Sequence, residues 1–199
     1  MTVAKDRLTT KPMTLEEYLD YDDGTDKRYE LIDGILVDMG AESDVNVMIG
    51  TFLIVVFSQL MPHRLIRRGS ELEVSGERAN TRIPDLIVLT HGGLAALPRD
   101  KRSLITLNMP APLLVVEVVS SSDTDRQSRD RDYTQKREEY EKRGILEYWV
   151  VDPIAEVVLV LSLNGDSYQE QTFTEDAKIV SPVLPKLDLQ VRQLLNADA

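Results

Sequence analysis

The sequence contains no cysteine and only two histidines, His63 and His91, among its 199 residues. The missing cysteines exclude a disulfide framework, a thiolate zinc site and a cysteine nucleophile. Two histidines are too few for a three-histidine zinc centre, and they leave few candidates for a Ser-His-Asp triad. Each histidine stands alone beside a turn, so we assign neither a function.

Long apolar segments are also missing. The longest runs, such as 113–116 and 157–161, are far shorter than the ~20 residues of a membrane-spanning helix. Residues 1–12 carry charges but no apolar stretch of the kind found in secretion signals. We therefore expect a soluble, cytoplasmic protein without a membrane partner.

Positive charge is scarce and unevenly distributed. The chain has 34 acidic and 23 basic residues, a formal net charge of −11, which argues against tight, non-specific binding of nucleic acid. Residues 63–83 are the exception, because five arginines stand there against three glutamates. A local basic face is possible in this region, although scattered solvated charges are an alternative. The candidates for nucleic-acid contacts are Arg64, Arg67, Arg68 and Arg82.

The composition, 42% hydrophobic and 29% charged, is that of a globular chain. Its length predicts one domain, 13–199, behind an N-terminal tail, 1–12. The pattern predicts a capped helix beginning at Thr14, a strand pair around Asp33-Gly34 and a hairpin around Asn164-Gly165. Further elements are a helix over 44–61, extended segments at 64–74, 81–89, 113–119 and 145–151, a helix over 126–143, and a terminal helix at 188–195.

This order of elements predicts an α/β fold, a mixed β-sheet flanked by helices. The strand at 113–119, the helix at 126–143 and the strand at 145–151 would form a right-handed βαβ crossover.

Glu117 interrupts the apolar run 113–119, which is typical of a strand buried on both faces. A glutamate in such a strand is costly unless it is paired, protonated or bound to a metal. The alternative is an edge strand with Glu117 facing solvent.

Asp85 follows Pro84 and opens a second apolar run, 86–89. Alone, it reads as a turn residue that starts a strand. Two carboxylates on neighbouring strands, however, can hold a hard divalent cation that prefers oxygen ligands. Asp85 and Glu117 are therefore the candidate metal ligands.

Lys136 lies on the predicted helix three residues after Tyr133 and four before Tyr140, so it shares their inward face. If that helix lies beside the Glu117 strand, the amine would reach the metal site and offset charge in a transition state. The alternative is a lysine whose stem packs while its amine reaches water.

Several motifs together resemble the Uma-type restriction endonuclease family of the PD-(D/E)XK nuclease superfamily. They are 13–18 (Met-Thr-Leu-Glu-Glu-Tyr), 29–34 (Tyr-Glu-Leu-Ile-Asp-Gly), 82–85 (Arg-Ile-Pro-Asp), 117–120 (Glu-Val-Val-Ser) and 144–152, which begins Gly-Ile-Leu-Glu-Tyr-Trp. The resemblance spans about 13–195 and implies a restriction-endonuclease-like core.

The resemblance also implies residue roles. Asp85 and Glu117 would bind Mg²⁺, or Mn²⁺ as a substitute, helped by the carbonyl of Val118. The superfamily's strand lysine is missing, since Val119 occupies its place, and the resemblance points to Lys136 as its replacement. Glu30 matches a position near the active site and is a candidate catalytic residue by that resemblance, while its local pattern alone indicates a surface glutamate of a strand. Asn46 stands where the family has a histidine. Ser120 is a candidate phosphate contact.

From this resemblance we expect a Mg²⁺-dependent endonuclease that hydrolyses DNA and forms a homodimer. Its affinity for DNA should be low because the chain is acidic. Two alternatives stay open. One is a non-catalytic nucleic-acid or protein interaction module on the same fold, and the other is a metal-dependent hydrolase of small phosphoesters.

Overall fold

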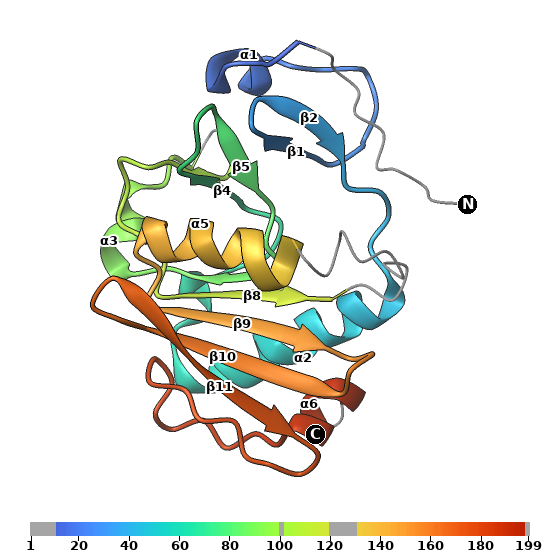
Figure 1. Ribbon diagram of the computed structural model, residues 1–199, viewed down its shortest axis with the longest axis vertical. Helices are drawn as coiled ribbons and strands as arrows, with labels where there is room; N and C mark the ends of the chain where they lie inside the picture. Colours follow the sequence, from blue (N-terminus) through green and yellow to red (C-terminus); the bar gives the residue numbers. More distant parts are fainter. Residues whose placement is uncertain (1–10, 100–101, 120–130, 198–199) are drawn as a thin grey trace.

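The structure is a computed structural model that describes residues 11–99, 102–119 and 131–197. Two β-sheets form its frame, a smaller one at the top of Figure 1 and a larger one below it. Helices cover both faces of the larger sheet, so the predicted α/β fold with flanking helices is confirmed. Within the described ranges, no helix has the length and apolar character to cross a bilayer.

The larger sheet has six strands in the order β11-β10-β9-β8-β6-β3, and only β8 and β9 run parallel. Strands β8 and β9 are parallel neighbours, as predicted, and the β10–β11 hairpin is confirmed as well. The strands are β3 (Ile66–Arg67), β6 (Leu86–Val88), β8 (Leu114–Val118), β9 (Glu147–Asp152), β10 (Val157–Asn164) and β11 (Ser167–Thr174).

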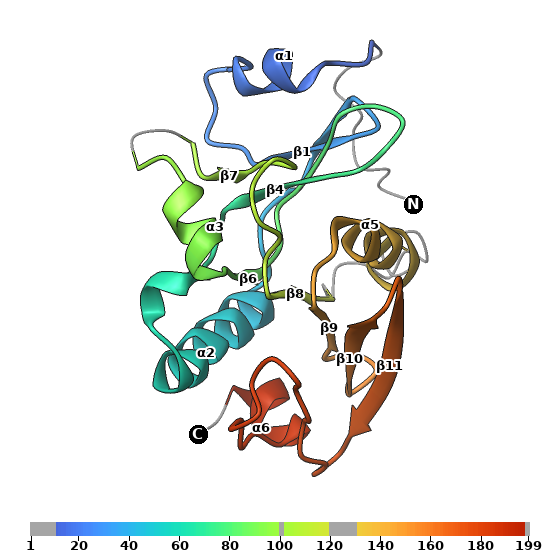
Figure 2. The same cartoon turned by 90° about the vertical axis from the view of Figure 1, so that its left-hand side faces the viewer.

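Side chains of β8 alternate between two separate cores because successive residues of a strand point to opposite faces. Leu114, Val116 and Val118 pack into the core beneath helices α2 and α6. Val115 packs into the opposite core, which includes Tyr140 of helix α5. Figure 2 shows α2 and α5 on opposite sides of β8. Glu117 therefore belongs to the α5 face.

Helices α1, α2, α5 and α6 lie near their predicted positions, whereas α3 was not predicted and η1 occupies the start of 64–74, a segment predicted to be extended throughout. The bounds are α1 (Leu15–Leu19), α2 (Asp44–Leu60), the 3₁₀ turn η1 (His63–Leu65), α3 (His91–Ala96), α5 (Lys136–Arg143) and α6 (Val191–Asn196). The capping box of Thr14 and Glu17 is present at α1, as expected.

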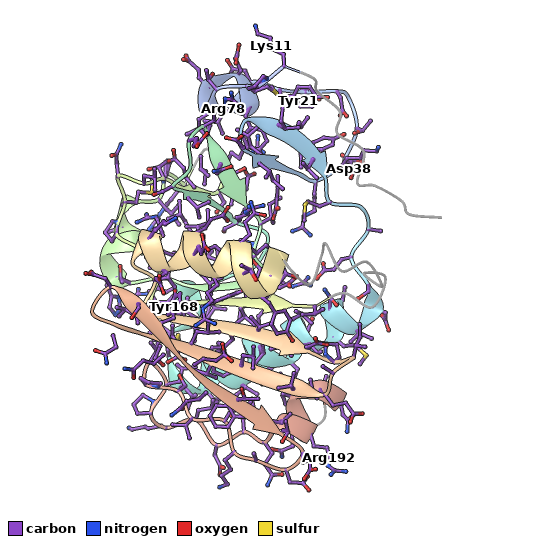
Figure 3. The ribbon with its side chains drawn as sticks, viewed as in Figure 1. Lys11, Tyr21, Asp38, Arg78, Tyr168 and Arg192 are labelled. Carbon is purple, nitrogen blue, oxygen red and sulfur yellow. The ribbon has the colours of Figure 1, made fainter. Side chains whose placement is uncertain are left out.

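The predicted regular helix over 126–143 is wrong in part. Residues 131–135 form a π-helical turn, η2, and the α-helix α5 begins only at Lys136. Gly144 ends α5 in the left-handed conformation, as its position suggested. Residues 126–130 lie outside the described ranges. Tyr168 of β11, labelled in Figure 3, connects α5 to the sheet. Its N–H donates to Glu141 of α5 at 2.7 Å, and its hydroxyl donates to the carbonyl of Ile145, just after the helix.

The smaller sheet has the strand order β2-β1-β5-β4-β7. Asp33 and Gly34 both have positive φ at the β1–β2 turn, which confirms the predicted hairpin. The strands are β1 (Tyr29–Ile32), β2 (Ile35–Asp38), β4 (Glu71–Val74), β5 (Asn80–Arg82) and β7 (Leu104–Ile105).

The predicted single extended segment at 81–89 is instead divided between the two sheets. Its first part, β5, belongs to the smaller sheet, and its second part, β6, belongs to the larger one. Pro84 lies at the crossing, where a residue without a backbone N–H costs no ladder hydrogen bond. Asp85 follows directly, so this carboxylate stands at the junction of the two sheets.

Candidate active site

Glu117 is buried at the centre of the larger sheet, and its side chain is paired. Strands β6 and β9 flank β8 on either side, so the alternative of an edge glutamate facing solvent is wrong. The Lys136 Nζ lies 2.7 Å from Oε2, and the Tyr140 hydroxyl donates to Oε1 at 2.6 Å. Two donors from one helix thus meet the one carboxylate that interrupts the strand.

Lys136 is only 2% exposed, so the alternative in which its amine reaches water is wrong. Its ammonium group also lies 2.9 Å from Oδ1 of Asp132, one turn earlier, in the π-helical segment. Asp132 is buried too. The predicted inward face of this helix is therefore confirmed, and it carries a buried charge cluster.

Asp85 lies beside Glu117 because it binds the backbone of the next residue. Its Oδ2 accepts the Val118 N–H at 2.6 Å. The side chain is partly buried, unlike the fully enclosed Glu117 and Lys136. We call Asp85, Glu117, Asp132 and Lys136 the site cluster.

The electrostatics of the site cluster favour added positive charge. Burial raises the pKa of Asp85 to about 6, although the Val118 N–H and the Lys136 charge oppose the shift. Burial also raises the pKa of Glu117, and the charges of Asp132 and Asp85 add to the effect against Lys136. With every group ionised, three carboxylates face one ammonium, leaving a net charge of −2.

The carbonyl of Val118 is oriented by helix α2. Asn46 Nδ2 in the first turn of α2 donates to it at 3.0 Å. Asn46 is held in turn by Ser43, the N-cap, whose hydroxyl lies 2.8 Å from its Oδ1. Because a carbonyl has two lone pairs, one stays available for another partner.

These oxygens suit a hard cation. Within the described ranges, no three His, Cys, Asp or Glu side chains gather as a metal cluster. A cation here would be held by the carboxylates of Asp85 and Glu117 and the carbonyl of Val118, an all-oxygen set. Three such donors suit Mg²⁺, because this ion retains several waters when proteins bind it.

A second buried ionic group braces the junction of the sheets. Arg82 is fully buried and donates from Nε and NH2 to Glu139 at 2.7 and 2.6 Å. Its NH1 donates to Glu30 at 3.1 Å, and Glu30 also accepts the Ile83 N–H at 3.0 Å. We call Glu30, Arg82 and Glu139 the bracing cluster.

Two predictions change with this geometry. Arg82 cannot contact DNA, since its guanidinium is enclosed and bound by two carboxylates, so that prediction is wrong. Burial lowers the pKa of Arg82, but Glu139 and Glu30 raise it by more, and it stays charged. The bonds described for Glu30 run to Arg82 and to the segment that carries Asp85, which makes it a positioning residue.

Sequence reasoning missed Glu139 and Asp132. Glu139 is three residues after Lys136, and Asp132 is four before it, so both share the helix face that identified the lysine. Applying that spacing to acidic residues as well would have found them.

The remaining arginines belong to neighbouring elements: Arg64 to η1, Arg67 to β3, and Arg68 to the turn between β3 and β4. Arg64 is exposed, and Arg67 is half-buried with its NH1 donating to the Ile66 carbonyl at 2.9 Å. Arg68 forms an ion pair with Glu42. Ser120 lies outside the described ranges.

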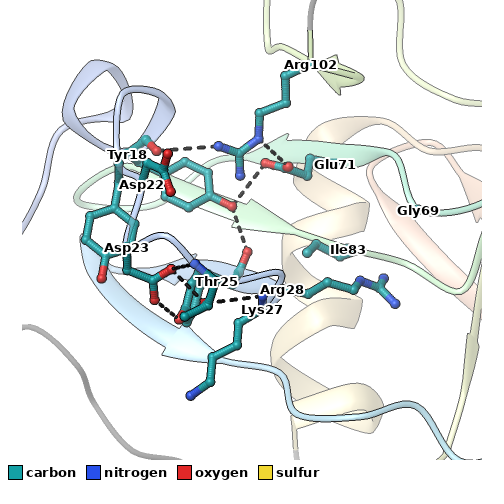
Figure 4. A pocket seen from close by; sticks show the side chains of 12 residues that line it. Tyr18, Asp22, Asp23, Thr25, Lys27, Arg28, Gly69, Glu71, Ile83 and Arg102 are labelled. Carbon is teal, nitrogen blue, oxygen red and sulfur yellow. Dashed lines mark hydrogen bonds and ion pairs between the residues drawn. The ribbon is translucent and has the colours of Figure 1, made fainter.

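A polar pocket of about 230 Å³ opens beside the smaller sheet (Figure 4). Ile83 of the segment leading to Asp85 lines it, as does Arg102, whose guanidinium covers the Tyr18 ring at 4.4 Å. The other lining residues are Tyr21, Asp22, Asp23, Thr25, Lys27, Arg28, Tyr29, Gly69 and Glu71.

Comparison with known proteins agrees with this description. Residues 15–192 match the model of the Uma2 family, described as "Putative restriction endonuclease". A crystal structure described as a putative nuclease of DUF820 from Anabaena variabilis ATCC 29413 shares the fold. It has a TM-score of 0.72 and 20% identity, and the match covers 94% of this chain and 99% of that one. No curated protein matches the chain.

Proposed function

Since the chain belongs to the Uma2 family of restriction-endonuclease-like proteins, we propose that it is a Mg²⁺-dependent endonuclease that hydrolyses phosphodiester bonds in DNA. The observation that carries the proposal is the buried contact between Lys136 and Glu117, with Asp85 bound to the adjacent backbone. A carboxylate pair and a fixed ammonium are the groups that phosphodiester hydrolysis needs.

Asp85, Glu117 and the carbonyl of Val118 would hold the cation, with Mn²⁺ as a substitute for Mg²⁺. When bound, a divalent ion there lowers the pKa of water and offsets charge at phosphorus. The partial exposure of Asp85 gives this ion and a substrate access from solvent, while Asn46 orients the carbonyl.

Lys136 supplies the charge that the strand position lacks. Val119 is buried on the same face of β8 as Glu117, in the place of the superfamily lysine. The ammonium of Lys136 reaches Glu117 from α5 instead. Held by two carboxylates, it can donate to an attacking water or to a phosphate oxygen without reorganising.

The described candidates for DNA contacts are Arg64, Arg67 and Arg68. The net charge of −11 weakens the overall affinity, so binding should depend steeply on salt. We propose a homodimer as the working form, because a duplex has two strands to cut.

Nicking of supercoiled plasmid in Mg²⁺ and Mn²⁺ tests the activity, with Asp85→Asn as the inactive control. Cleavage by the unchanged protein and none by Asp85→Asn is expected. Equal cleavage by both would show a contaminating nuclease. No cleavage despite metal binding would favour an interaction module, and cleavage of a chromogenic diester alone would favour a small-phosphoester hydrolase.

Metal binding is tested separately by calorimetry with Mn²⁺. Asp85→Asn and Glu117→Gln should each abolish binding while the far-ultraviolet circular dichroism stays unchanged. Equal binding by all three proteins would refute the ligand assignment.

A further inference from the structure

Two arginines outside the site cluster converge on one carboxylate. Glu42, just before the N-cap of α2, forms an ion pair with Arg68 through Oε1. Its other oxygen, Oε2, lies 3.7 Å from NH1 of Arg28. The two arginines come from different parts of the chain, one before β1 and one between β3 and β4.

The guanidinium of Arg68 packs against helix α2 at Gly50. A Cβ atom on Gly50 would lie 3.0 Å from Nε of Arg68 and 3.4 Å from NH2. Glycine inside a helix costs about 0.5–1 kcal/mol relative to alanine. At this position it lets the guanidinium lie directly against the helix backbone.

This arginine pair adjoins the proposed active site. The negative charge of Glu42 contributes to the raised pKa of Asp85, and α2 contacts the Val118 carbonyl through Asn46. Arg28 also lines the polar pocket beside Ile83, and Figure 4 shows its side chain directed away from the Asp23–Thr25 turn.

We propose that Arg28 and Arg68 form a phosphate clamp, in which Glu42 holds the two guanidinium groups until a backbone phosphodiester of the substrate replaces it. The clamp rests on the proposed function, since it assumes a nucleic-acid substrate at Asp85 and Glu117. A phosphodiester presents two non-bridging oxygens, as Glu42 presents two carboxylate oxygens, and arginine is suited to both. The side chains of Arg28 and Arg68 are 45% and 30% exposed, so a ligand can reach them.

Gly50→Ala separates the clamp from general stability. The added methyl group favours the helix, which offsets the loss of the exposed Arg68–Glu42 ion pair, so Tm should change little. It also displaces the Arg68 guanidinium, so affinity for a fluorescein-labelled DNA duplex, measured by anisotropy in chelator, should fall a few-fold. Gly92→Ala in α3 is the matched control, because its Cβ finds ordinary contacts, the nearest at 3.5 Å.

Two further variants test the charges. Arg68→Ala should weaken duplex binding about tenfold and reduce the slope of log affinity against log salt by about 1. Glu42→Gln should strengthen binding, because the competing charge is gone. Unchanged affinity and slope in Gly50→Ala and Arg68→Ala, or weaker binding by Glu42→Gln, would overturn the clamp.

Inorganic phosphate identifies the ligand chemistry. At equal ionic strength it should compete with the duplex better than chloride does, and this advantage should vanish in Arg68→Ala. An advantage that survives in Arg68→Ala would place the phosphate site elsewhere and overturn the clamp. If the binding pattern holds but the unchanged protein fails to nick plasmid, the proposed function is wrong while the clamp stands as a nucleic-acid contact.

Discussion

The bracing cluster and the site cluster both bury a cation among carboxylates, yet they are organised differently. Arg82 donates from Nε, NH1 and NH2 to two carboxylates that fit its planar fork. Lys136 is a compact point charge between Glu117 and Asp132, with Asp85 close by and partly open to solvent. The bracing cluster pairs one guanidinium with two carboxylates, and all three side chains are buried. The site cluster sets three carboxylates against one ammonium and includes the partly exposed Asp85.

The comparison shows that helix α5 contributes to both clusters, one that connects it to the smaller sheet and one at the candidate site. The bracing cluster ties β1, β5 and α5 together and fixes the segment that leads to Asp85. The site cluster then uses the same helix α5 to hold an ammonium against Glu117. Arg82 connects the smaller sheet to α5, and the carboxylates beside Lys136 are those that the proposed function assigns to a cation.

Breaking the bracing cluster should have the largest effect on stability. Arg82→Ala leaves Glu30 and Glu139 buried without a cation, and we expect a loss of about 3–5 kcal/mol in the free energy of unfolding. Denaturation in urea measures it. Arg78→Ala, at an exposed ion pair with Asp33, is the control and should change stability by less than about 0.5 kcal/mol. A similar small loss in Arg82→Ala would contradict the bracing role.

Removing the site lysine should instead affect the rate. Lys136→Ala should slow plasmid nicking about 10²–10³-fold, the usual cost of a lost transition-state donor, while Mn²⁺ binding measured by calorimetry is retained. Lys136→Arg should not restore the rate fully, because a planar guanidinium is no substitute for a point charge. Val119→Lys on the Lys136→Ala background should recover part of it. Nicking by Lys136→Ala at the normal rate would end the role proposed for this lysine.

The burial of Asp85 should appear as a pH dependence of stability without metal. Because burial raises the pKa of Asp85 from 3.8 to about 6, the folded state binds the proton more tightly than the unfolded state. Its contribution is therefore greatest below about pH 4 and is lost as the pH rises through 6, by at most about 3 kcal/mol.

Asp85→Asn should remove this slope. The comparison is the difference in unfolding free energy between the two proteins, measured in chelator at pH values from 4 to 7. A constant difference across that range would show that Asp85 titrates normally.

The smallest expected effect is a difference in stability between two variants that each lose one tyrosine hydroxyl. One hydroxyl donates to a charged carboxylate and the other to a neutral carbonyl. Tyr140→Phe removes the hydroxyl that donates to Glu117, and we expect a loss of about 1.5–3 kcal/mol. Tyr168→Phe removes a bond to the neutral carbonyl of Ile145 and should lose about 0.5–1.5 kcal/mol. Urea titration of both variants measures the difference, and equal losses would argue that Glu117 is neutral in the metal-free protein.

The sequence was informative where the signal is local or periodic. The apolar run around Glu117 predicted a central strand, and the spacing of Tyr133 and Tyr140 predicted that Lys136 faces inward. Both positions are confirmed by burial and by the contact between the two side chains. The catalytic roles of these residues stay predictions.

What the sequence did not predict depends on partners distant along the chain. Arg82 looked like one more surface arginine, because its partners, Glu30 and Glu139, are 52 and 57 residues away. The division of 81–89 between two sheets also escaped prediction, since Pro84 marks a break in a ladder but not which sheet each half joins. The π-helical turn before Lys136 has no periodic signature of its own.

The distance along the chain between the parts of the site has a consequence for synthesis on the ribosome. Asp85 emerges before Lys136 by 51 residues, or about 3–10 s at ordinary elongation rates. Strand β8 gains its parallel neighbour β9 only after Asp152 has followed. A nascent chain therefore carries Asp85 for seconds before the lysine and the bracing glutamate of α5 arrive, and the site cluster can assemble only when most of the protein has been made.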